Sequence, residues 1–191
     1  TIWIHSVSAN QTDLQLKTDS SILMEATTGS ILYEHNSNQR KYPASVTKIA
    51  TAIYAIENAN LDDIVTVSEN ARYAKGTRVY LEAGEQVTLE KLLYGLMINS
   101  GNDAAVAIAE HISGTEEQFA IDLTNYLIEK TGIQNTNFTN SSGLFDENHY
   151  STAYDLATIV QYAMKNETFM KFYNAKELRW IGESWDTTIV S

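Results

Sequence analysis

Ser45 and Lys48 have the residue types and the spacing of a nucleophile with an adjacent base. They follow Pro43, the only proline of the chain, whose preset φ and missing N–H suit the first turn of a helix. Apolar residues then recur at helical spacing and predict a helix with one buried face that ends near residues 58–60: Val46, Ile49, Ile53 and Ile56. On that helix Ser45 and Lys48 lie one turn apart on the same face, which brings an amine close to a hydroxyl.

Ser100 and Asn102 form a second candidate group, on a short connection between two predicted helices. Each residue also has an ordinary structural explanation, since serine and asparagine commonly end one helix and cap the next. We expect Asn102 and Asp103 to cap the following helix. A bare Ser-x-x-Lys has a similar and more common explanation, a serine cap beside a solvated lysine. The chemical interpretation depends on both groups occurring in one chain, each at a helix terminus.

The elements that must position these side chains are strands at both ends of the chain and helices between them. Residues 21–25 and 31–34 flank a turn that contains Gly29, a pattern typical of a β-hairpin. A second hairpin is predicted within residues 178–190. Further helices are predicted from capping residues and apolar spacing, with N-caps at Thr88, Thr115 and Thr152 and a glycine end at Gly132. This order predicts an α+β fold rather than alternating α/β.

Composition limits the classes of function. The net charge is −11 without any basic run, which argues against nucleic acid or an anionic membrane as the main partner. The chain has no cysteine, so disulfides, thiol catalysis and cysteine-bound zinc are excluded. The four histidines are scattered without the spacing of metal ligands: His5, His35, His111 and His149. No nucleotide-binding fingerprint and no apolar run of transmembrane length occur.

The Ser45–Lys48 and Ser100–Asn102 groups together give the chain a resemblance to a known family. Residues 43–48 (Pro-Ala-Ser-Val-Thr-Lys) and 100–104 (Ser-Gly-Asn-Asp-Ala) look like the first two motifs of the low-molecular-weight penicillin-binding proteins. More narrowly, they resemble the serine-type D-Ala-D-Ala carboxypeptidases of peptidase family S11. Other landmarks extend the resemblance over roughly residues 20–191, among them Ser142-Gly143-Leu144 and the stretch 149–156.

The resemblance implies a β-lactamase/transpeptidase-like fold, with a helix-rich block inserted between antiparallel strands. It implies that Ser45 attacks the penultimate D-alanine of a peptidoglycan stem peptide and is also acylated by β-lactams. It also implies that Lys48 takes the serine proton, that Ser100 relays a proton to the leaving amine, and that Asn102 binds the substrate backbone. No metal or organic cofactor is implied. The location implied is extracytoplasmic, cell-surface or secreted, with a signal peptide and any membrane anchor outside this sequence.

The third motif of the family is Lys-Thr-Gly on a strand that lines the site. Lys130-Thr131-Gly132 has these letters, but it ends a predicted amphipathic helix, so we interpret it as a helix terminus. The implied triplet then falls beyond Ser191. We therefore expect a loose arm over residues 1–20 and, over residues 21–191, an incomplete catalytic domain that lacks the C-terminal strands of its sheet.

Two alternatives stay open at this stage. A chain that keeps two motifs without the third is compatible with a non-catalytic module that binds muropeptide or a protein partner. A β-lactamase is the nearest enzymatic alternative, but a class A enzyme needs a deacylating carboxylate in a Glu-x-x-Leu-Asn loop, and no such string occurs here. Covalent labelling by penicillin separates these alternatives.

Overall fold

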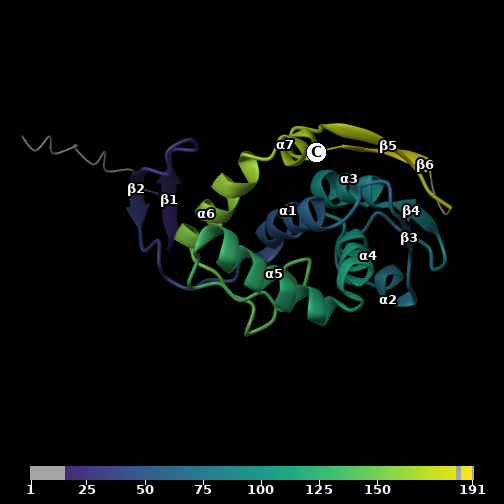
Figure 1. Cartoon of the computed structure of the whole chain (residues 1–191), viewed down its shortest axis with the longest axis horizontal. Coiled ribbons are helices and arrows are strands. Elements are labelled where there is room, and N and C mark those ends of the chain that lie inside the picture. Colours follow the sequence, from purple (N-terminus) through teal and green to yellow (C-terminus); the bar gives the residue numbers. More distant parts are fainter. Residues whose placement is uncertain (1–15, 184–185, 191) are drawn as a thin grey trace, which may run out of the picture.

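The first hairpin forms as predicted. The computed structural model describes residues 16–183 and 186–190, so most of the arm predicted over residues 1–20 lies outside the described residues. β1 (Ser21–Met24) pairs antiparallel with β2 (Ile31–His35). Gly29 takes a φ of +76° in the turn, a backbone conformation that glycine adopts without steric cost. Figure 1 shows this hairpin at one end of the molecule beside α6.

The helices form a block around one central helix, α1, which contacts five others. The bounds are α1 (Thr47–Asn58), α2 (Glu69–Arg72), α3 (Leu89–Asn99), α4 (Asn102–Ser113), α5 (Glu116–Thr131), α6 (Ala153–Met164) and α7 (Glu167–Tyr173). Figure 1 shows α1 among α3, α4, α5 and α6. The short helices α2 and α7 were not predicted. We conclude that α1, the helix that carries Lys48, lies at the core of the block.

The start of α1 differs from the sequence prediction. Pro43 precedes a short 3-10 turn, η1 (Ala44–Val46), and α1 begins one residue after it. The prediction of a single buried face is wrong, because Val46 is 42% exposed whereas consecutive residues 50–55 are all buried. Helices packed on several sides of α1 bury it around most of its circumference, so its alanines and threonines form part of the packed core together with its isoleucines.

The predicted N-caps are confirmed for three helices. The hydroxyls of Thr88, Thr115 and Thr152 each accept the backbone N–H three residues on, at the starts of α3, α5 and α6. The prediction for α4 is wrong: Gly101 is its N-cap, without a side-chain hydrogen bond, and Asn102 is its first helical residue. The side chains of Asn102 and Asp103 instead bind the backbone of residues 75–81.

Two small sheets complete the fold. β3 (Ile64–Thr66) pairs with β4 (Gln86–Thr88), and β5 (Glu177–Ile181) pairs with β6 (Asp186–Val190), both antiparallel. The β5–β6 hairpin was predicted, and it contacts α3 through the fully buried Trp180, which lies against Gly95. The strand, helix, strand order is α+β, as predicted. No helix within the described residues is long and apolar enough to cross a membrane.

Candidate active site

Ser45 and Lys48 lie side by side where η1 passes into α1. Lys48 Nζ is 3.5 Å from Ser45 Oγ and donates a 2.9 Å hydrogen bond to the carbonyl oxygen of Ser142. Ser45 is exposed, whereas Lys48 is only 4% exposed. The hydroxyl is therefore accessible from solvent while the amine is buried behind it.

Burial changes the acid–base behaviour of Lys48. Removal of the ammonium from water lowers the pKa of Lys48 from 10.5 to about 8. Its two hydrogen-bond partners, a hydroxyl and a carbonyl, are both neutral and do not restore the lost hydration of a charge. A pKa of about 8 leaves roughly a tenth of Lys48 neutral at pH 7, enough for it to accept a proton from a neighbouring hydroxyl.

Ser100 lies on the same cleft. A hollow of about 400 Å³ is lined by Ser45, Lys48, Ile49, Leu96, Met97, Ser100 and Tyr173. Ser100 is the C-cap of α3 and takes a left-handed conformation, φ 55° and ψ 37°, which is uncommon for a residue other than glycine. Uncommon backbone conformations concentrate at functional sites. The structure therefore brings three of the four predicted site residues to one cleft.

Asn102 does not line this cleft with the other three. Its side-chain amide donates to the carbonyl of Lys75 at 2.6 Å, and its backbone N–H donates to Thr77 O. Asn102 is 7% exposed. Gly76 passes so close that a Cβ on it would lie 2.6 Å from the Asn102 amide nitrogen. In this arrangement Asn102 holds the segment 75–77 against the start of α4.

The loop 140–144 supports the site and was not recognised as support from sequence. Ser142 supplies the carbonyl that binds Lys48, and the carbonyl of Ser141 accepts a 2.7 Å hydrogen bond from Thr51. A Cβ on Gly143 would lie 1.8 Å from the carbonyl oxygen of Ala44, so only glycine permits this approach. Ser142 and Gly143 stood out only as part of a family landmark, and a glycine within a polar loop was the one local signal.

Lys130 lies away from the cleft, as the sequence predicts. It occupies the last turn of α5, and Gly132 is the left-handed C-cap of that helix with φ 74°. The Lys130 ammonium lies near Glu129 and over the ring of Tyr126. The Lys-Thr-Gly letters are therefore a helix ending. The described residues supply two of the three motifs that the resemblance implies.

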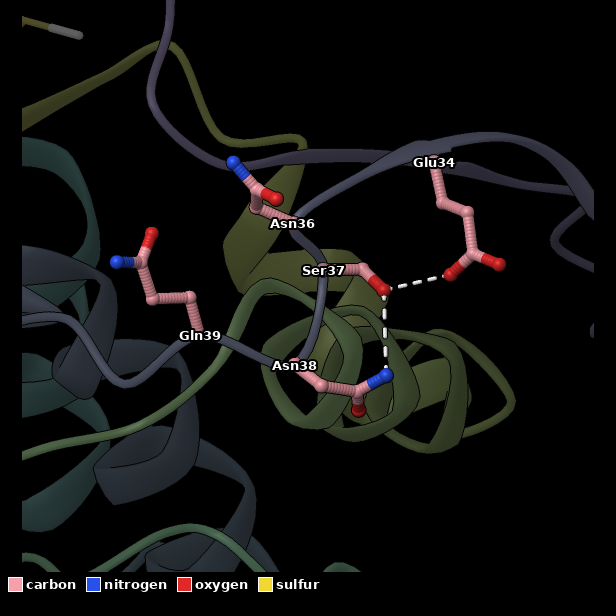
Figure 2. A pocket seen from close by; sticks show the side chains of 5 residues that line it. All are labelled: Glu34, Asn36, Ser37, Asn38 and Gln39. Carbon is pink, nitrogen blue, oxygen red and sulfur yellow. Dashed lines mark hydrogen bonds between the residues drawn. The ribbon is translucent and has the colours of Figure 1, made fainter.

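A larger hollow lies elsewhere and lacks such chemistry. It measures about 670 Å³ and is lined by Glu34, Asn36, Ser37, Asn38 and Gln39 (Figure 2). Ser37 Oγ donates to Glu34 at 2.6 Å, as Figure 2 shows, so that hydroxyl faces a carboxylate rather than an amine. Within the described part of the chain, no three His, Asp or Glu side chains are grouped to hold a metal ion. The Ser45 cleft is therefore the candidate active site.

Comparison with known proteins identifies the family of the chain. The family model described as peptidase S11, D-alanyl-D-alanine carboxypeptidase, matches residues 5–188. The D-alanyl-D-alanine carboxypeptidase DacF of Bacillus subtilis is 41% identical over 170 residues, 86% of this chain and 43% of the relative. DacA of Haemophilus influenzae is 35% identical over 192 residues, 92% of this chain and 49% of the relative. The chain thus spans about half the length of the curated relatives that it matches.

Solved structures give the same result. The D-alanyl-D-alanine carboxypeptidase DacD from Francisella tularensis superposes with a TM-score of 0.86 at 33% identity, over 96% of this chain and 45% of that one. Penicillin-binding protein 5 from Haemophilus influenzae superposes with a TM-score of 0.83 at 32% identity, over 92% of this chain and 52% of that one. The fold is therefore the penicillin-binding, transpeptidase-like fold. The chain belongs to the peptidase S11 family of D-alanyl-D-alanine carboxypeptidases.

Proposed function

We propose that this chain carries the acylation site of a serine D-Ala-D-Ala carboxypeptidase that removes the terminal D-alanine from peptidoglycan stem peptides. The observation that carries the proposal is a buried lysine amine, with a pKa of about 8, placed 3.5 Å from an exposed serine hydroxyl in an open cleft. A solvated lysine beside a serine cap would have neither the burial nor the lowered pKa.

In the proposed first step Ser45 Oγ attacks the carbonyl carbon of the penultimate D-alanine. Neutral Lys48 accepts the hydroxyl proton, and a tetrahedral intermediate forms. The peptide C–N bond then breaks. Ser100, on the same cleft, passes a proton to the leaving nitrogen, so D-alanine departs as an amine. Water hydrolyses the acyl-serine and restores the enzyme.

A β-lactam is expected to react with Ser45 by the same steps. Ser45 Oγ attacks the lactam carbonyl, the ring C–N bond breaks, and the nitrogen takes the proton. Because the opened ring stays attached, the leaving group does not diffuse away. The expected product is a covalent penicilloyl-Ser45 adduct.

The role proposed for Asn102 requires a change of partner. Binding a substrate backbone needs an amide that is free to donate, and here Asn102 donates to the carbonyl of Lys75. We propose that substrate replaces that carbonyl as the acceptor. The substrate class also supports an extracytoplasmic, cell-surface or secreted location, with membrane attachment only through segments outside this sequence. We further propose residues 21–191 as a portion of the catalytic domain.

A second candidate is favoured by one observation. The only Lys-Thr-Gly of the chain is a helix ending, so the strand motif that completes such sites is not supplied by the described residues. A loss of one oxyanion-hole donor typically costs about a hundred- to a thousandfold in rate. The alternative is therefore a catalytically incomplete module that binds muropeptide or a protein partner.

The test is release of D-alanine from an acyl-tripeptide that ends in D-Ala-D-Ala. It is run on the 191-residue chain and on any longer polypeptide that carries it, each with Ser45→Ala as the matched control. Release that depends on Ser45 in either form supports the carboxypeptidase. Binding of the peptide by both forms without release from either overturns it and favours the binding module. Rapid turnover of penicillin without peptide cleavage would indicate a β-lactamase instead.

A further inference from the structure

His149 is buried directly behind the first turn of α1. It is 1% exposed and precedes α6 in the chain, 102 positions from its hydrogen-bond partner Thr47. Thr47 Oγ1 lies 2.8 Å from His149 Nε2, and the backbone N–H of Thr139 donates to His149 Nδ1 at 3.0 Å. The imidazole therefore bridges α1 and the segment around residue 139.

The geometry determines which ring nitrogen carries the proton. A backbone N–H can only donate, so Nδ1 of His149 must be an acceptor and hold no proton. In a neutral imidazole the proton is then on Nε2. Nε2–H of His149 consequently donates to Thr47 Oγ1, and both ring nitrogens have a partner.

Thr47 is the residue through which this bridge reaches the site. It lies between Ser45 and Lys48, is fully buried, and takes no part in the chemistry described above. A Cβ on Gly143 would lie 3.0 Å from Thr47 Oγ1, so the loop 140–144 packs against the same hydroxyl. Any rotation of the η1–α1 turn would break the Thr47–His149 hydrogen bond.

We propose that His149 is a positioning residue, which in its neutral Nε2–H tautomer holds Thr47 and thereby fixes the Ser45–Lys48 pair. The consequence for acylation depends on the function proposed above, but the consequence for the burial of Lys48 does not. With the bridge in place, Lys48 stays buried against Ser142. Without it, the turn relaxes and the ammonium regains water.

A second proton on His149 would oppose the bridge. It would add an N–H at Nδ1 facing the N–H of Thr139, and two donors cannot share a hydrogen bond. The Thr139 hydroxyl, 3.3 Å from Nδ1, would be the acceptor that remains for it. Burial lowers the pKa of His149, while Asp146, in the preceding loop, raises it to a smaller extent. Lys48 is the titratable residue of the adjacent turn of α1, and its amine is directed to Ser142. Acidification is therefore expected to weaken the contact between His149 Nδ1 and the Thr139 N–H, and so to loosen the bridge at its Thr139 end.

Two variants separate the two hydrogen bonds. His149→Gln keeps an amide donor for Thr47, whereas His149→Asn keeps an acceptor for Thr139 and loses the reach to Thr47. Thr47→Val removes the hydroxyl, and Thr47→Ser restores it. Thr124→Val is the matched control, since Thr124 is a buried threonine of α5 that binds Ala120 and Phe138 instead.

The first measurement is NMR, which requires no enzymatic activity. Imidazole ¹⁵N shifts are expected to show Nε2–H for His149 at pH 7. The pKa of Lys48 is expected near 8 in the unaltered chain, Thr47→Ser and Thr124→Val, and displaced toward 10.5 in Thr47→Val and His149→Asn. An Nδ1–H tautomer, or a Lys48 pKa that is the same in all variants, overturns the proposal.

The second measurement is the rate constant for acylation by fluorescent penicillin at saturation. A fall of roughly ten- to a hundredfold is expected for Thr47→Val and His149→Asn, with unchanged noncovalent affinity. His149→Gln and Thr47→Ser are expected to retain most of the rate. Equal rates in all folded variants overturn the positioning role. If the unaltered protein is not acylated, the proposed function fails, and the Lys48 pKa still decides this inference separately.

Discussion

Replacement of Lys48 by methionine tests the burial of its amine without requiring catalysis. Methionine keeps the length and apolar stem of lysine but carries no charge. Burial lowers the pKa of Lys48 from 10.5 to about 8. At about 1.4 kcal/mol per pKa unit, the protonated amine costs the folded state about 3 kcal/mol below pH 8. We therefore expect Lys48→Met to be more stable than the unaltered chain at pH 7, by up to about 3 kcal/mol.

The sign of the pH dependence follows from proton binding. The folded chain releases the Lys48 proton near pH 8, while the unfolded chain keeps it until about pH 10.5. Between these values the unfolded state binds more protons, so the Lys48 contribution makes the folded state more stable as pH rises. The contribution is flat below pH 8. The advantage of Lys48→Met is expected to shrink across this window and to vanish near its upper end.

The assay is urea unfolding of both proteins, followed by circular dichroism, at pH 7, 8, 9 and 10. Lys176→Met is the matched control, because Lys176 is exposed and its removal should give no such pH-dependent difference. The reasoning is refuted if the difference between the unaltered chain and Lys48→Met does not change with pH. It is also refuted if Lys48→Met is the less stable protein at pH 7, since the amine would then contribute more by its hydrogen bonds than it costs by its burial.

Three further predictions concern the same site. The acylation rate constant for penicillin is expected to rise about tenfold per pH unit up to about pH 8 and then level off, because neutral Lys48 is the base; a pH-independent rate from 6 to 9 contradicts this. Gly143→Ala should lower the free energy of unfolding by about 2 to 5 kcal/mol, because its Cβ would meet the Ala44 carbonyl and its φ is +85°. Gly132→Ala has a similar φ of +74° but open space around the added Cβ, so it should lower the free energy of unfolding by only about 1 kcal/mol. Equal losses would show that backbone strain alone explains Gly143. Lys130→Ala is expected to leave penicillin labelling unchanged, because Lys130 ends α5 outside the cleft; lost labelling in a folded variant would reverse that interpretation.

Local features of this fold were predictable from sequence. The Thr88, Thr115 and Thr152 caps act on the backbone three residues away, so a short window of sequence contains the whole interaction. The Ser45–Lys48 pair is likewise a local spacing of three residues, although it spans the passage from η1 into α1 rather than one helix. The α+β order followed from these same local patterns, and Lys130 was correctly assigned to a helix ending because Gly132 follows it.

Interactions between distant segments were not predictable in this way. The carbonyl that binds Lys48 lies 94 positions along the chain, and the imidazole that binds Thr47 lies 102 positions along it. Asn102 and Asp103 have the side chains of helix caps, yet the segment 75–81 takes both of them as partners. Backbone groups that need partners in the folded state compete for the same side chains, and a single sequence does not show which group prevails.

Mass spectrometry of the protein after exposure to penicillin tests the central claim most directly. The protein is treated at pH 8, its intact mass is determined, and the adduct is located by peptide mapping, with Ser45→Ala in parallel. We predict one penicilloyl group per chain, attached to Ser45 and absent from Ser45→Ala, in the 191-residue chain or in a longer polypeptide that contains it. An adduct on another residue, or no adduct on any form of the protein, would contradict the assignment of Ser45 and Lys48 as nucleophile and base.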